Sequence, residues 1–158
     1  MPEQAKPVLV PVDFSLHSHA AAAFAADLSQ RLKTPLVILH VAHDPAEAPG
    51  YYDKVRKHSN DELARIEDKA LEAMQEFLER AQVEHPDLAT AFARATPRVV
   101  VGLPVGRILE VVEQLDPSMV VMGSLGRTGL ARLYIGSKAE QVVRLCPAPV
   151  TIVKTAKP

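Results

Sequence analysis

The chain is poor in cysteine, in net charge and in long apolar runs. Cys146 is the only cysteine among 158 residues, so an internal disulfide is excluded, a reducing compartment is indicated, and only a bridge to another molecule stays open. We expect Cys146 to serve as a small apolar side chain. The formal net charge of -1 provides no basic field to hold nucleic acid or an anionic membrane. We therefore expect neither partner, and any anion has to be held locally.

No apolar run approaches the ~20 residues of a membrane-spanning helix. The opening residues, MPEQAKP, are too short and too polar a segment to resemble a signal peptide. We therefore expect a cytoplasmic protein. With 47% hydrophobic and 23% charged residues, the composition is that of an ordinary globular domain, and we expect residues 1–158 to form one domain.

Five short runs rich in Val and Ile recur along the chain, and they are largely continuous instead of alternating. Such runs are typical of strands buried on both faces of a parallel sheet. The expected strands are Val8–Phe14, Pro35–Val41, Arg98–Leu103, Ser118–Ser124 and Pro149–Lys154.

Segments with a helical period separate these runs. The expected helices are Leu16–Lys33, Asp61–Gln82, Val105–Leu115 and Ser137–Leu145. The alternation of strand and helix predicts an α/β fold, a single open five-stranded parallel sheet with helices on both faces. The irregular stretch His43–Asn60 is either a mobile flap or a surface loop, and its role stays open.

Four of the seven glycines fall between Met122 and Glu140, directly after the fourth expected strand. Ligands of open parallel sheets bind beyond the carboxyl ends of the strands. Glycine admits positive φ and has no Cβ, so this backbone could approach an anion closely, and Gly136-Ser137 would open the last helix as a phosphate site. Arg127 could add charge-assisted hydrogen bonds. The alternative is that these residues are turn glycines and a helix cap.

The glycine spacing excludes two known phosphate motifs. Six residues separate the glycines of GLARLYIGSK where a Walker loop has four, and GSLGRTG lacks the tight first pair of a dinucleotide fingerprint. The spacing is instead Gly123, two residues, Gly126, nine residues, Gly136 and Ser137.

This spacing resembles the nucleotide-binding pattern of the universal stress protein family, and the similarity extends over almost the whole chain. VPVDFS resembles the family's first strand and turn, ILHV its second strand, VVMGSLGRTGLARLYIGSKAEQVV its signature segment, and CPAPVTIVK its closing strand. The resemblance implies a Rossmann-like sheet that binds ATP or a related adenine nucleotide. Family members without these glycines generally do not bind ATP, and this chain retains them.

The resemblance also implies a set of nucleotide-binding residues. Pro11, Val12 and Val41 would surround the base, Asp13 would meet the adenosine, and Met122 and Gly123 would lie against the nucleoside. The residues facing the phosphates would be Gly126, Arg127, Gly136 and Ser137, and Ser124 would be a further nucleotide-binding residue. From the residues alone, the Asp13 carboxylate could accept from a ribose hydroxyl or an adenine amine, or cap the following helix through a local turn.

Two positions depart from the common family pattern. Leu125 stands where a histidine is frequent, which removes an imidazole contact. Lys138 stands where a small or apolar residue is usual. It lies in the first turn of a helix, where the dipole disfavours a cation, so it either reaches a phosphate or points to water.

No metal site built by the protein is expected. His17 with His19, or His40 with His43, could pair, but no cysteine or carboxylate cluster completes a tetrahedral set. A magnesium ion bridging the phosphates of ATP is more plausible, since Mg²⁺ often binds with few protein ligands.

We expect a regulatory module that binds ATP and does not hydrolyse it, because no base that could activate an attacking water is evident near the glycines. A slow ATPase and a nucleotide-free dimeric scaffold remain the alternatives, and a regulatory protein partner would be of unknown identity. The last strand, Val150–Val153, lacks charge and would lie at a sheet edge in the doubly wound order. Family dimers often pair these strands, so the resemblance implies a homodimer. The alternative is an edge covered by the terminal residues Thr155 to Pro158.

Overall fold

The computed structural model describes residues 4–43, 60–125 and 135–155. Its five strands are β1 (Val8–Pro11), β2 (Leu36–Ala42), β3 (Thr96–Val101), β4 (Met119–Gly123) and β5 (Val150–Val153). All neighbours pair in parallel, in the order β3-β2-β1-β4-β5. The predicted five-stranded parallel sheet is confirmed. The order reverses between β1 and β4, where the chain runs outward in opposite directions along the sheet.

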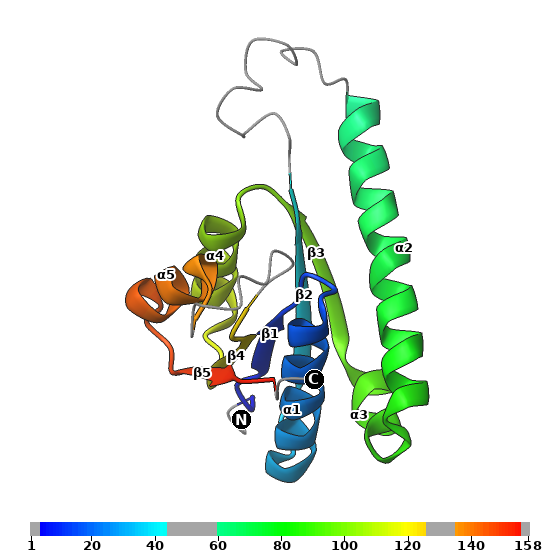
Figure 1. Cartoon of the computed structure of the whole chain (residues 1–158), viewed down its shortest axis with the longest axis vertical. Helices are drawn as coiled ribbons and strands as arrows, with labels where there is room; N and C mark the ends of the chain where they lie inside the picture. Colours follow the sequence, from blue (N-terminus) through cyan, green and yellow to red (C-terminus); the bar gives the residue numbers. More distant parts are fainter. Residues whose placement is uncertain (1–3, 44–59, 126–134, 156–158) are drawn as a thin grey trace.

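The helices cover both faces of this sheet, as predicted. On one face lie α1 (Leu16–Leu32), α2 (Asn60–Glu84) and α3 (Ala89–Arg94), and on the other α4 (Pro104–Leu115) and α5 (Ser137–Leu145) (Figure 1). Strand β1 is buried along its whole length between the two helical layers, which explains its continuous apolar sequence. Of the four predicted helices, every one is found with ends shifted by at most two residues.

A 3-10 turn, η2 (Pro86–Leu88), and the short helix α3 were not predicted. A helix of six residues is too short to show a clear apolar period. Leu88 and Phe92 are nevertheless buried. This pair therefore extends the core under α2 although no pattern in the sequence indicated a helix there.

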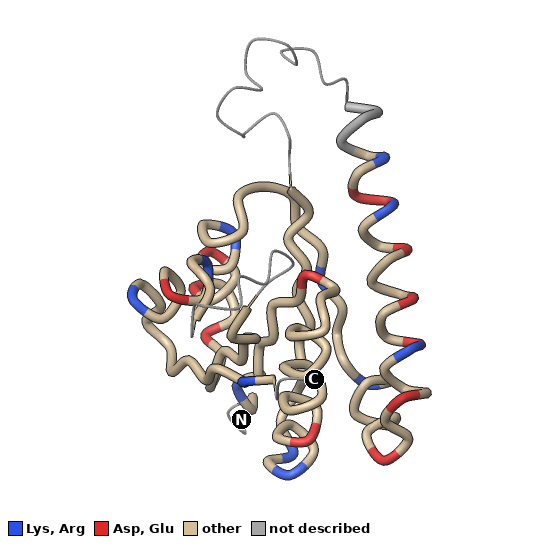
Figure 2. Tube along the Cα trace, in the orientation of Figure 1, with Lys and Arg blue, Asp and Glu red and all other residues tan. Residues whose placement is uncertain are grey.

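Each face of the sheet has its own hydrophobic core. Beneath α1 and α2 the core includes Ala22, Met74, Phe77 and Phe92, and beneath α4 and α5 it is aliphatic, including Ile108 and Val142. The charged residues of α2 face away from the sheet (Figure 2), as its amphipathic sequence predicted. Cys146 is half-buried against the second core, in the apolar role expected of it. Within the described ranges, no helix is both long and apolar enough to cross a membrane.

Candidate functional site

A cavity of about 320 Å³ lies where the strand order reverses, at the carboxyl ends of β1 and β4. This is the usual ligand position in an open α/β sheet, and the volume falls within the range of small-molecule sites. Nine of the eleven predicted site residues line it: Pro11, Val12, Asp13, Val41, Met122, Gly123, Ser124, Gly136 and Ser137. The other two, Gly126 and Arg127, lie outside the described residues, as does most of the stretch His43–Asn60. We call the cavity at the carboxyl ends of β1 and β4 the upper cavity.

The turn between β1 and α1 forms one wall of the upper cavity. Asp13 Oδ1 accepts a hydrogen bond from the Ser15 N–H at 3.0 Å, and Ser15 caps α1 by accepting from the Ser18 N–H at 3.2 Å. The local-turn role considered for Asp13 is therefore present. Asp13 lines the cavity as well.

Phe14 takes a left-handed conformation at this turn, with φ of 66°. An aromatic residue rarely adopts this conformation unless its surroundings hold it there. The ring stacks on His40 with centroids 4.2 Å apart and meets Phe77 of α2 at 5.6 Å. These contacts fix the turn so that Asp13 lies at the cavity.

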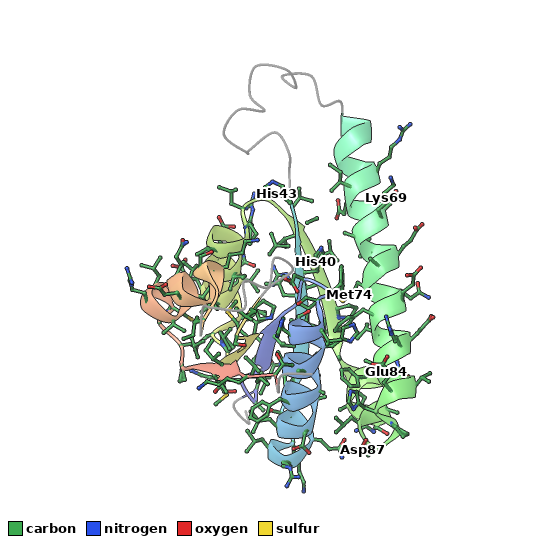
Figure 3. All side chains as sticks on the ribbon, viewed as in Figure 1. His40, His43, Lys69, Met74, Glu84 and Asp87 are labelled. Atoms are coloured by element: carbon green, nitrogen blue, oxygen red, sulfur yellow. The ribbon has the colours of Figure 1, made fainter. Side chains whose placement is uncertain are left out.

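His40 contributes a polar ring to the wall of the upper cavity. Its Nδ1 lies 2.8 Å from the Val12 carbonyl oxygen, and because a carbonyl only accepts, the Nδ1 carries the proton. Figure 3 shows His40 and His43 toward the same end of the sheet. Both line the cavity, but the described part of the chain holds no group of three or more His, Cys, Asp or Glu placed to bind a metal.

The opposite wall is the junction between β4 and α5. The Ser124 N–H donates to the Val153 carbonyl at 3.1 Å, and the Gly136 N–H donates to the Ser124 carbonyl at 2.6 Å. These bonds bring the two ends of the glycine segment together. Gly136 is the N-cap of α5 and provides no capping side chain. The first turn of α5, whose N–H groups have no partner within the helix, therefore borders the cavity with its positive dipole end.

The two described glycines of this wall, Gly123 and Gly136, do not adopt positive φ. Gly126 and Gly129 lie outside the described residues, so the role expected of their backbone stays a prediction. Gly136 has φ of -68°, and Gly102 is the sole described glycine with positive φ. Gly123 is required for another reason: a Cβ there would lie 2.7 Å from the backbone oxygen of His17. Its small size allows the first turn of α1 to pack directly on β4.

Several residues of the cavity wall were not predicted as binding residues. They include Ser18, His40, Pro104 and Ile108. His40 precedes the predicted Val41, and Pro104 begins a helix directly after β3, so both occur at carboxyl ends of strands. That position is a usable signal, although it does not reveal which side chain faces inward. Leu125 and Lys138, the two departures from the family pattern, also line the cavity.

Comparison with known proteins gives a consistent result across nearly the whole chain. The model of the universal stress protein family matches residues 4–154. Universal stress protein Rv2623 of Mycobacterium tuberculosis is 32% identical over 97% of this chain, which spans only 46% of that protein. Universal stress protein MJ0577 of Methanocaldococcus jannaschii is 25% identical, with 94% of each chain covered.

Solved structures of universal stress proteins share the fold of this chain. UspA from Lactobacillus plantarum superposes with a TM-score of 0.73 at 24% identity, over 96% of this chain and 99% of its own. A universal stress protein solved in complex with cAMP has a TM-score of 0.65 at 23% identity, over 98% and 100% of the two chains. One from Archaeoglobus fulgidus, solved with dAMP, gives 0.60 at 18%, over 96% and 100%. The chain belongs to the universal stress protein family.

Proposed function

We propose that the protein binds ATP or a related adenine nucleotide in the upper cavity and acts as a regulatory module in a stress response. The observation that carries the proposal is the convergence of four chain segments on one cavity. These are the turn after β1 with the start of α1, the end of β2, the first half of α4, and the junction from β4 to α5. Two fold relatives were solved with cyclic AMP and deoxy-AMP, which supports an adenine nucleotide as the ligand class.

Each wall suits a different part of the nucleotide. Pro11, Val12, Val41 and Met122 offer apolar surface to the base, and the Asp13 carboxylate suits a ribose hydroxyl. The open first turn of α5 at Gly136 and Ser137 suits phosphate, because its N–H groups and dipole favour an anion. Gly126 and Arg127 remain predicted phosphate neighbours, Ser124 remains a predicted nucleotide-binding residue, and a magnesium ion would be held mainly by the phosphates.

The protein purified without added nucleotide provides a direct test. It is denatured, and the supernatant is analysed for adenine nucleotide. Protein freed of nucleotide is then titrated with ATP in a calorimeter while phosphate release is followed. ATP bound without phosphate release supports the regulatory module. Phosphate release at the rate of a slow enzyme supports an ATPase, and no bound nucleotide with no ATP binding supports a nucleotide-free scaffold.

We also propose a homodimer that pairs β5 of each chain, because the two edges of the sheet differ. The β3 edge contains Pro97 and Arg98, and proline and charge both discourage pairing of an edge strand. The β5 edge, Val150–Val153, contains neither and is half-exposed along its length. An antiparallel pair of β5 strands about a two-fold axis would extend one sheet through both protomers.

Ile152→Pro tests this interface, because proline removes a hydrogen-bond donor from the ladder. We expect light scattering to find a dimer for the parent and a folded monomer for the variant. Thr96→Pro, at the other edge, is the control and should leave the dimer intact. A monomeric parent contradicts the dimer, and a dimeric Ile152→Pro contradicts this interface. A pull-down with and without ATP would then identify a regulatory protein partner.

A further inference from the structure

A second cavity, of about 660 Å³, lies at the opposite end of the sheet from the upper cavity. It is bounded by the carboxyl end of α1, the start of β2 and helix α3. Figure 3 shows Asp87, one of its lining residues, far from His40 and His43. We call it the basal groove. None of its lining residues borders the upper cavity.

Three charged side chains line the basal groove: Lys33, Asp87 and Arg94. None of them forms an ion pair with another residue of the described ranges. Arg31, two residues before Lys33, is instead paired with Asp27 at 2.9 Å. The groove therefore offers two cations and one carboxylate that are not neutralised by pairs with described residues, and its local charge is positive.

Polar uncharged groups and an apolar surface complete the groove. Gln30 and Thr90 provide an amide and a hydroxyl, while Leu36 and Ala91 provide apolar contact. Thr34 Oγ1 is buried and has no hydrogen-bond partner among the described residues. Such a hydroxyl is uncommon in folded proteins, and it lies beneath the surface of the groove instead of facing into it.

We infer that the basal groove binds a small organic acid, with its acid groups at Lys33 and Arg94 and its carbon skeleton against Leu36 and Ala91. Arg94 suits a carboxylate because a guanidinium can donate two parallel hydrogen bonds to it. Asp87 lies in the same groove, and its carboxylate weakens the binding of any anion there by repulsion. The site is separate from the nucleotide site and does not depend on the proposed function.

Titration with glutarate, followed by amide chemical shifts at constant ionic strength, tests this inference. We expect saturable shifts at Lys33, Thr34, Thr90 and Arg94 that are the same with and without ATP. Glutaramide, which has the same skeleton without the charges, should cause none. Absence of saturable shifts with glutarate, or equal shifts with glutaramide, overturns the inference.

Matched variants locate the binding. Arg94→Gln should weaken glutarate by about three- to fivefold, the effect of one partly exposed charge pair. Arg31→Gln removes the same charge nearby but outside the groove and should leave the affinity unchanged. Asp87→Asn should tighten binding by about twofold or more because it removes a repulsion. If Arg31→Gln and Arg94→Gln weaken glutarate binding equally, the effect comes from general surface charge, and the inference of a site in the basal groove is overturned.

Discussion

The two ends of the sheet carry cavities that are built from different parts of the chain. The upper cavity is bordered by strand ends and by the first turn of α5, so backbone and apolar side chains form most of its wall. The basal groove is bordered by long polar side chains of helices α1 and α3. The upper cavity therefore gathers segments from most of the length of the chain, whereas the basal groove is lined by two segments, residues 29–36 and 87–94.

Gly123 lies at the upper end of the sheet and packs directly against the first turn of α1. In Gly123→Val the new side chain would meet the His17 backbone, which cannot move without displacing α1. We expect the free energy of unfolding to fall by about 1–3 kcal/mol, the usual cost of overpacking. Urea denaturation measures it.

Gly106→Ala is the control for this substitution, because no atom lies within 4 Å of a Cβ at Gly106. It lies in α4, so the variant should be as stable as the parent or more stable by about 0.5–1 kcal/mol. A Gly123→Val protein that unfolds at the same urea concentration as the parent would show that the turn is not packed as described.

Gly136→Val should separate the two cavities by function. The backbone at Gly136, with φ of -68° and ψ of 156°, accommodates valine, so the fold should persist. The branched side chain would occupy the first turn of α5, where we place phosphate, and we expect at least about a tenfold loss of ATP affinity, or 1.4 kcal/mol.

Thr90→Val, at the basal groove, is the matched control and should leave calorimetric ATP binding unchanged. If Gly136→Val binds ATP as tightly as the parent does, the phosphates do not lie at the amino end of α5. We expect the same loss of ATP affinity in Gly126→Val, at another position of the glycine pattern.

The side chain of Lys138 either contacts a phosphate of the bound nucleotide or points to water, and a substitution distinguishes the two. Its side chain is exposed at the cavity rim. If it reaches a phosphate, Lys138→Gln should weaken ATP by about threefold and leave adenosine unchanged, since an exposed charge pair contributes little. Lys69→Gln, on the distant helix α2, is the control. Equal loss for ATP and adenosine would indicate a change in shape instead of a lost phosphate contact.

We expect the smallest effect, on the pH dependence of stability, at His19. This residue of α1 packs against Phe77 of α2 with ring centroids 4.3 Å apart. Burial lowers the pKa of His19 below its ordinary value of 6.5. Arg80 and His85 act in the same direction and Glu84 opposes them. The unfolded chain therefore takes up this proton at a higher pH than the folded protein does.

The free energy of unfolding should consequently fall as the pH is lowered through 6.5, because protonation favours the unfolded state. Above that pH the contribution of His19 is fully present. In His19→Gln the slope of stability against pH should be shallower between pH 7 and 5, measured by urea denaturation. An unchanged slope would mean that His19 does not titrate differently in the two states.

Local patterns in the sequence predicted the strands and long helices. Continuous apolar runs such as Val8–Pro11 can only be satisfied by burial on both faces, and the period of α2 indicates one buried face. The pair η2 and α3 was missed because Pro86–Arg94 is too short for a period to emerge. Its burial depends on the space beneath α2, which only the assembled fold defines.

The position of the upper cavity was predicted because ligands of open parallel sheets bind beyond the carboxyl ends of the strands. Most of its predicted lining residues came from the resemblance to the universal stress protein family. The sequence could not determine why Gly123 is small, since its neighbour His17 is more than a hundred residues away. Nor could it place His40 in the wall or gather Lys33, Asp87 and Arg94 into a groove. Those contacts join residues far apart in the chain, and only tertiary packing sets their distances.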